Sequence, residues 1–105
     1  MKNLRIYPFL LFLFLAAFID AQDPYVDSLR LVLKDLGLDT TRVNTLNAIA
    51  TAVYSSDHDM AISYGTEAKE LAEMISFPAG EALAYKNIGL GYYFQGEYAE
   101  AARNW

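Results

Sequence analysis

The chain has 105 residues, no cysteine and a formal net charge of −5, with 8 Lys and Arg against 13 Asp and Glu. Without cysteine, disulfides, cysteine-ligated metals and thiol chemistry are excluded. The acidic balance, with no cluster of Lys and Arg, argues against nucleic acid and anionic lipid as partners, because phosphate contacts require such clusters. This length allows at most one small domain.

Residues 1–21 have the pattern of a secretory signal peptide. Lys2 and Arg5 form a basic start, and an uncharged apolar run over residues 6–19 follows them. This run is shorter than the roughly 20 residues that span a bilayer, and the small residue Ala21 ends the segment. We therefore expect cleavage near Ala21 and export to the periplasm or out of the cell. The alternative is an N-terminal anchor that is not cleaved.

Residues 23–36 are predicted to form an amphipathic helix. Asp23 is a suitable N-cap with Pro24 at the first helical position, and Gly37 is expected to end the helix. One face carries the apolar residues Val26, Leu29, Leu33 and Leu36. Because so short a helix is marginal alone, residues 22–38 are expected to form a capping helix that packs on the next elements.

Four further helices are predicted at about 40–54, 58–75, 78–94 and from residue 98 onward, so the fold class expected is all-α. Helix-capping and helix-breaking residues separate them. These corners are Asp39, Ser55-Ser56-Asp57, Phe77-Pro78 and Gln95-Gly96-Glu97.

The four helices form two pairs that repeat each other. Residues 46–50 match residues 85–89 at an offset of 39, and residues 57–61 match residues 97–101 at an offset of 40. Small residues recur where the two helices of a pair would touch, because large side chains there would force the axes apart. These predicted repeat-packing residues are Ala50, Ala61, Gly89 and Ala101.

The second pair resembles the tetratricopeptide repeat (TPR) family. The matching positions are Tyr85, Ile88, Gly89, Tyr92, Gly96, Tyr98 and Ala101. The first pair is looser, with His58 in place of the usual aromatic residue and Gly65 in place of a bulky one. A period near 40 residues exceeds the family's usual length of about 34 and resembles exported bacterial members. The resemblance implies antiparallel helix-turn-helix repeats, at about 43–76 and 82–105, that stack into a right-handed α-solenoid within residues 39–105.

The second repeat is expected to be truncated, because only residues 98–105 follow its corner. Stacked repeats bury their faces against neighbours, so Trp105 is expected to pack against a further unit of a longer protein. The resemblance implies that such exported proteins often continue into a membrane helix and an output domain. Membrane attachment through a downstream segment, and a catalytic domain beyond Trp105, are left open.

We predict no catalytic residue, cofactor or metal in this segment. Asp57, His58 and Asp59 form a cluster of metal-ligand types, but an N-cap and a first-turn acid explain the two aspartates, and a second histidine is absent. The Gly-Leu-Gly sequence at 89–91 lacks the third glycine and the preceding strand of a dinucleotide-binding loop. Gly91 is expected to be exposed.

The functional surface implied by the resemblance is the concave face, lined by the first helix of each pair. The family's ligand-facing positions fall here on Asn44, Asn47, Thr51, Tyr54, Leu83, Lys86, Asn87, Leu90 and Tyr93. Side-chain amides can hold a peptide backbone, Lys86 can meet a carboxylate, and tyrosines offer aromatic contact. The alternative is that these residues bind no ligand and are either solvated or packed against further repeats of the same protein.

The function expected is that of a protein–protein interaction module, a scaffold that binds a peptide or protein partner and is not an enzyme. The alternative is a periplasmic sensory region of a membrane signalling protein, such as a histidine kinase, a cyclase or a DNA-binding regulator.

Overall fold

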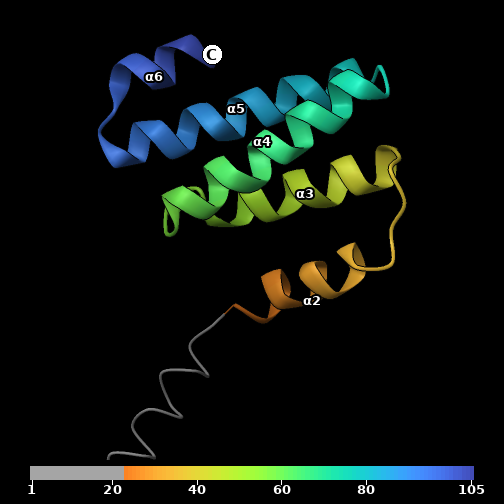
Figure 1. The fold of residues 1–105 in the computed structure, drawn as a ribbon. Coiled ribbons are helices and arrows are strands. Elements are labelled where there is room, and N and C mark those ends of the chain that lie inside the picture. Colours follow the sequence, from red (N-terminus) through yellow and green to blue (C-terminus); the bar gives the residue numbers. More distant parts are fainter. Residues whose placement is uncertain (1–22) are drawn as a thin grey trace, which may run out of the picture.

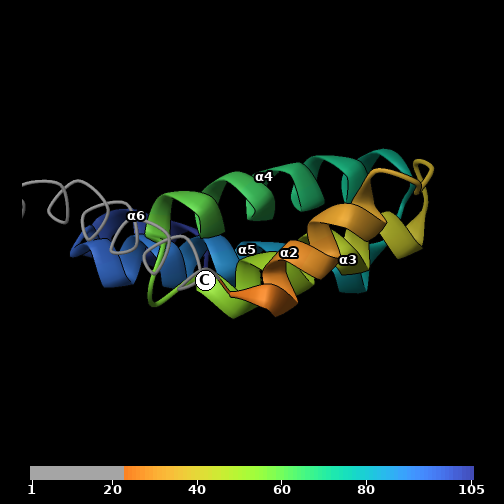
Figure 2. The ribbon, with the colours of Figure 1, turned by 90° about the horizontal axis from the view of Figure 1, so that it is seen from below.

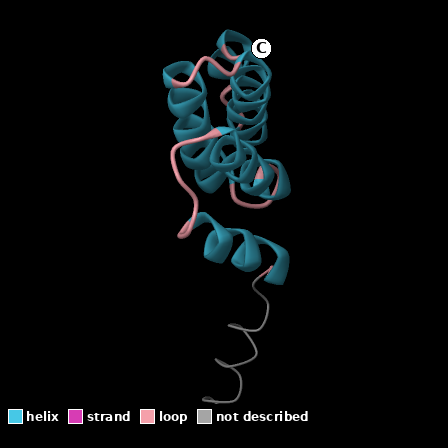
Figure 3. Ribbon diagram, turned by 90° about the vertical axis from the view of Figure 1, so that its right-hand side faces the viewer, coloured by secondary structure: helices cyan, strands magenta, loops and turns pink. Residues whose placement is uncertain are grey.

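The computed structural model describes residues 23–105, which form helices α2 (Pro24–Leu33), α3 (Thr40–Val53), α4 (His58–Met74), α5 (Pro78–Gln95) and α6 (Tyr98–Arg103). Within this range only helices and loops occur, as Figure 3 shows. The all-α prediction is confirmed. The signal peptide predicted at 1–21 lies outside the described residues.

The helices follow one another as antiparallel neighbours from α3 to α6, so α3 and α5 run in the same direction (Figure 1). α5 packs against α3, α4 and α6, whereas α2 packs against α3. Seen from below, α4 lies on one side of a layer that contains α3 and α5 (Figure 2). α5 is therefore the element that joins the first helix pair to the second.

Three helices begin at the aspartates predicted to cap them. Each carboxylate accepts a hydrogen bond from a backbone N–H two or three residues ahead: Tyr25 N to Asp23 at 2.9 Å, Arg42 N to Asp39 at 3.0 Å and Met60 N to Asp57 at 3.1 Å. These bonds satisfy donors that a helix start otherwise leaves without a partner. α5 begins without a side-chain cap, at Pro78, which has no N–H to satisfy.

α2 ends at Leu33, three residues before the predicted end, and Gly37 does not terminate it. The backbone N–H groups of residues 34–36 bond three residues back instead of four, which tightens the chain into turns. The Arg42 guanidinium donates to Leu33 O at 2.9 Å and to Leu36 O at 3.3 Å. A side chain of α3 therefore takes over carbonyls that a longer helix would have paired.

The corners after α4 and α5 share one backbone geometry. Ser76 and Gly96 both have positive φ, 58° and 85°. In each corner the backbone N–H of the residue that follows donates a hydrogen bond to the carbonyl five residues before it: Phe77 N to Ala72 O at 2.8 Å and Glu97 N to Tyr92 O at 2.9 Å. This left-handed ending suits glycine, whereas the Cβ of serine is strained there.

Replacing Ser76 with glycine is expected to raise the free energy of unfolding by about 0.5–1 kcal/mol, because glycine relieves the left-handed strain at some cost in chain entropy. Gly96→Ser is the matched control and should lower it by a similar amount. Urea titration followed by circular dichroism measures both, and a Ser76→Gly midpoint at or below the parent's would contradict the expectation.

Most of the buried apolar residues fall into two clusters. One lies between α3, α4 and α5 and contains Val43, Leu46, Ala68, Leu71, Ala72 and Ala84. The other lies under α2 and contains Val26, Ile49, Val53 and Ala61, with Leu29 and Leu33 packed against it. α2 thus covers one flank of the α3–α4 pair with Val26, Leu29 and Leu33, three of the four residues of its predicted apolar face, whereas Leu36 lies beyond the end of the helix.

α4 and α5 approach closely at two glycines. A Cβ on Gly65 would lie 2.9 Å from Ile88 Cγ1, and one on Gly91 would lie 2.8 Å from Ile62 Cγ1 and 3.2 Å from His58 O. The expectation that Gly91 is exposed is therefore wrong, because this residue is buried against α4. Gly65 likewise lies where the neighbouring helix leaves no room for the bulky residue usual in the resembled family.

Candidate functional site

The predicted repeat-packing residues lie at helix contacts. Ala50, Ala61 and Ala101 are buried at 0, 0 and 2% exposure. A Cβ on Gly89 would lie 3.3 Å from Ala101 O and 3.5 Å from Trp105 Cδ1. The backbone of α5 therefore runs against α6 at Gly89, where a side chain would push α6 away.

The nine candidate peptide-binding residues divide by exposure. Asn44, Thr51, Leu83, Lys86 and Tyr93 are exposed, Tyr54 and Leu90 are half-buried, and Asn47 and Asn87 are buried. The parallel helices α3 and α5 carry all of them except Tyr54, which caps the end of α3. Seven of the nine side chains are thus accessible to a ligand to some degree.

Asn47 and Asn87 do not face a ligand, which corrects the expectation for both; they are 0 and 1% exposed. Asn47 Nδ2 donates to Gly80 O at 3.0 Å, and Asn87 Nδ2 donates to Asn47 O and Oδ1, both at 3.3 Å. Thr51 Oγ1 donates to Asn87 Oδ1 at 3.1 Å. These polar groups join α3 to α5, and each buried amide is satisfied there, as burial requires.

Six aromatic rings meet where α3 and α5 end. We call Tyr54, His58, Tyr93, Phe94, Tyr98 and Trp105 the aromatic cluster. The ring of Phe94 has its centroid 5.6 Å from that of Tyr54 and 6.4 Å from that of His58. Tyr93 lies 5.4 Å from Phe94, 5.4 Å from Tyr98 and 6.0 Å from Trp105. The rings therefore form one continuous group that joins four segments of the chain.

Much of the aromatic cluster is open to solvent. Tyr93 and Phe94 are each 45% exposed, Tyr98 64% and Trp105 65%. Contiguous exposed apolar surface of this kind marks interaction sites more often than chance, and Tyr and Trp are enriched among residues that dominate binding. Sequence reasoning selected Tyr54 and Tyr93 but missed Phe94, Tyr98 and Trp105 as part of a surface. The density of aromatic residues over 92–105 was the available signal.

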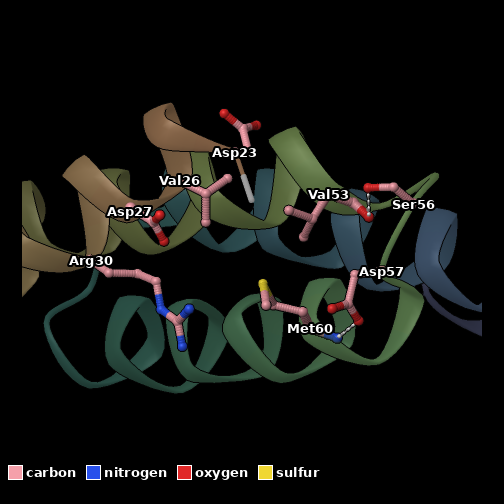
Figure 4. A pocket seen from close by; sticks show the side chains of 8 residues that line it. All are labelled: Asp23, Val26, Asp27, Arg30, Val53, Ser56, Asp57 and Met60. Atoms are coloured by element: carbon pink, nitrogen blue, oxygen red, sulfur yellow. Dashed lines mark hydrogen bonds between the residues drawn. The ribbon is translucent and has the colours of Figure 1, made fainter. Parts of the chain in front are cut away.

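An open pocket of about 410 Å³ lies where α2 meets the end of α3 and the start of α4 (Figure 4). Its apolar lining comes from Val26, Val53 and Met60, and its polar lining from Asp23, Asp27, Arg30, Ser56 and Asp57. Two of these carboxylates, Asp23 and Asp57, already cap α2 and α4. The pocket lacks a nucleophile paired with a base, so its arrangement offers no catalytic constellation.

The Asp57-His58-Asp59 segment has structural partners. Asp57 caps α4, the His58 ring stacks on Phe94, and Asp59 Oδ1 accepts a hydrogen bond from Gln95 Nε2 at 2.6 Å. Across residues 23–105, no three His, Asp or Glu side chains converge in a way that could hold a metal ion. In the same range no helix is both long enough and apolar enough to cross a membrane.

A second open groove, of about 610 Å³, lies between α5 and α6 and is lined by Ala82, Tyr85, Lys86, Arg103, Asn104 and Trp105. We call it the α5–α6 groove. Trp105 belongs both to this groove and to the aromatic cluster, so the two surfaces are continuous.

Comparisons of the chain with protein-family models, with curated proteins and with solved structures give no match. The residues and their arrangement are therefore the basis for any statement about function.

Proposed function

We propose that this chain is an exported, TPR-like interaction module whose two helix pairs belong to a right-handed α-solenoid. In this proposal a peptide or protein partner binds on the exposed side of α3 and α5. The partner contacts Tyr93 together with Leu83, Lys86 and Leu90 along α5. Export follows from the proposed signal peptide at 1–21.

The observation that carries the proposal is the exposed aromatic cluster. Tyr93 contacts Phe94, Tyr98 and Trp105 and yet keeps 45% of its surface exposed. A ring held by other rings is already ordered, so a ligand that covers it gains apolar contact with little loss of side-chain freedom. Rigid aromatic anchors of this kind are the usual centres of binding energy at protein interfaces.

The exposed side of α3 and α5 carries polar groups suited to ligand recognition. Asn44, Thr51 and Lys86 place an amide, a hydroxyl and an ammonium group on the exposed parts of α3 and α5. The amide and the ammonium group can donate hydrogen bonds to a peptide backbone or to a carboxylate, whereas the Thr51 hydroxyl already donates to Asn87 Oδ1 and can accept one. They act here as recognition groups beside an apolar anchor, the composition typical of a peptide-binding surface.

Replacing Tyr93 and Phe94 with alanine together is expected to weaken capture of the natural partner by about tenfold or more, since these rings would be the anchor. The purified protein would be used as bait with periplasmic extract of the source cells, and the recovered partner quantified by mass spectrometry. The matched control is Leu31→Ala, which removes an apolar side chain that is 62% exposed on α2. Equal recovery by both variants, with unchanged circular dichroism, would refute the proposal.

A further inference from the structure

The start of α3 and the end of α4 enclose a hollow of about 230 Å³, which we call the α3–α4 groove. The residues that line it are Leu38, Arg42, Leu46, Glu67, Glu70, Leu71 and Met74. Leu46 and Leu71 are buried at 2 and 5% exposure and form its base, whereas Leu38 and Met74 are 69 and 68% exposed and form its rim. Large apolar side chains that remain exposed above a buried apolar base are typical of an interaction site.

The α3–α4 groove is an internal feature of the described chain and does not lie at either of its ends. It lies at the end of the α3–α4 pair opposite the corner that joins the two helices, whereas Asp23 lies beside that corner (Figure 1). α2 already packs on this helix pair. The end of α2 borders the groove, because Arg42 donates to Leu33 O and Leu36 O. The groove is therefore surface that the neighbouring helices leave uncovered.

Carboxylates determine the charge of the α3–α4 groove. Glu67 and Glu70 line it, and neither pairs with a cation anywhere in residues 23–105. Arg42 also lines it, but its guanidinium donates to two carbonyls at the end of α2. Lys69, the only lysine of α4, has its Nζ 5.7 Å from the centre of the Tyr85 ring on α5. The groove thus keeps two unpaired carboxylates, and the net charge of −5 of the whole chain adds to their attraction for a cation.

We propose that the α3–α4 groove binds a basic peptide segment of a partner protein, in which Lys or Arg residues flank one large apolar side chain. The apolar side chain contacts Leu38, Met74 and the base of the groove, and the flanking cations meet Glu67 and Glu70. The inference goes beyond the proposed function, because none of the groove residues belongs to the aromatic cluster or to the nine candidate peptide-binding residues.

Size and charge both select this occupant. A volume of about 230 Å³ suits one side chain, since pockets for whole drug-sized ligands measure roughly 300–1,000 Å³. The flexible thioether of Met74 can adjust to an aliphatic or an aromatic side chain. A basic segment is attracted by the groove and by the chain as a whole, whereas a second copy carries the same net charge of −5 and is repelled.

Three fluorescently labelled synthetic peptides test the inference, with binding to the purified protein measured by fluorescence anisotropy. The first peptide has a central Leu between Lys residues. The second has Glu for every Lys, and the third has the same Lys residues with Ala for the central Leu. The first should bind about tenfold more tightly than either of the others, because it alone satisfies both the apolar and the charged parts of the groove.

Charge reversal in the groove provides the matched variant. Glu67→Lys with Glu70→Lys should reverse the preference, so that the acidic peptide binds more tightly than the first one. Glu81→Lys with Glu97→Lys makes the same change in net charge outside the groove and should retain the preference for the first peptide. Circular dichroism verifies that each variant remains folded.

The apolar contact is tested by Leu38→Ser with Met74→Ser. Both side chains are mostly exposed, so the fold should tolerate the change. This variant should bind the first peptide no more tightly than the parent protein binds the third. Tyr93→Ala with Phe94→Ala should leave the binding of all three peptides unchanged, so the proposed function and this inference stand or fail separately.

Several outcomes would overturn the inference. Equal binding of the first and second peptides removes the charge recognition, and equal binding of the first and third removes the apolar contact. An equal loss of affinity in the two charge variants assigns binding to the net charge of the chain. No binding of any peptide removes the groove as a docking site. Self-association in sedimentation that Glu67→Lys with Glu70→Lys abolishes assigns the groove to a second copy.

Discussion

Replacing Asn87 with leucine is expected to lower the free energy of unfolding by about 3 kcal/mol, because it removes the amide that joins α5 to α3. Asn87 is 1% exposed and bonds to the backbone and side chain of Asn47 and to the hydroxyl of Thr51. Leucine would leave the Asn47 side-chain oxygen without this donor inside the protein. Urea unfolding followed by circular dichroism measures the loss.

Asn44→Leu is the control for this prediction, since Asn44 lies on the same helix as Asn47 but is exposed. It should change the free energy of unfolding by no more than about 0.5 kcal/mol. The double variant Asn47→Leu with Asn87→Leu should cost less than the sum of the two single changes, because the partners are removed together. A parent-like midpoint for Asn87→Leu would show that the amides do not hold the two helices.

Replacing Gly91 with leucine is expected to lower the free energy of unfolding by about 3 kcal/mol, because α4 leaves no space for a side chain there. Even a Cβ would lie 2.8 Å from Ile62 Cγ1 and 3.2 Å from the backbone oxygen of His58. Ile62 can adjust its side chain, but the His58 carbonyl moves only if α4 moves. Thermal unfolding followed by circular dichroism gives the change.

Alanine at the same position separates the two effects. Gly91→Ala gains about 1 kcal/mol of helix propensity, which offsets part of the clash, so its net cost should be well below that of leucine. Gly37→Leu is the control, because a Cβ there meets only Asp39 Oδ2 at 3.9 Å. If Gly91→Leu and Gly37→Leu unfold at the same temperature, the close approach of α4 and α5 is not a stabilising contact.

The helix starts were readable from the sequence because each is decided locally. Asp23, Asp39 and Asp57 each cap a helix through a bond to a backbone group within three residues. Pro24 and Pro78 fix the backbone φ of the first helical residue through their own rings. The end of α5 is equally local, because Gly96 itself adopts the positive φ that stops the helix. Interactions that span so few residues can be predicted without knowing the rest of the fold.

The buried face of α5 was not readable in the same way. Apolar residues occur all around this helix, so periodicity does not choose one face over another. Asn87 and Gly91 are buried, whereas Leu83 and Tyr93 remain 40 and 45% exposed. These positions depend on how α5 crosses α3 and α4 together, which is a property of the assembled helices.

The candidate surface was only partly readable for a related reason. The resemblance to the TPR family directed attention to Tyr54 and Tyr93, which both contact Phe94. It did not indicate that Tyr98 and Trp105 extend the same surface from α6 and beyond. Their contacts with Tyr93 arise because the chain turns back along α5 after Gly96.

The three glycines within α5 have a consequence for the order in which the chain acquires its structure. Each costs about 1 kcal/mol of helix propensity relative to alanine, so residues 78–95 are weak helix formers when separated from the protein. Their helical state is stabilised by the neighbours that glycine allows to come close. Because the α3–α4 hairpin precedes α5 in the chain and has apolar contacts of its own, we expect α5 to become ordered on this hairpin.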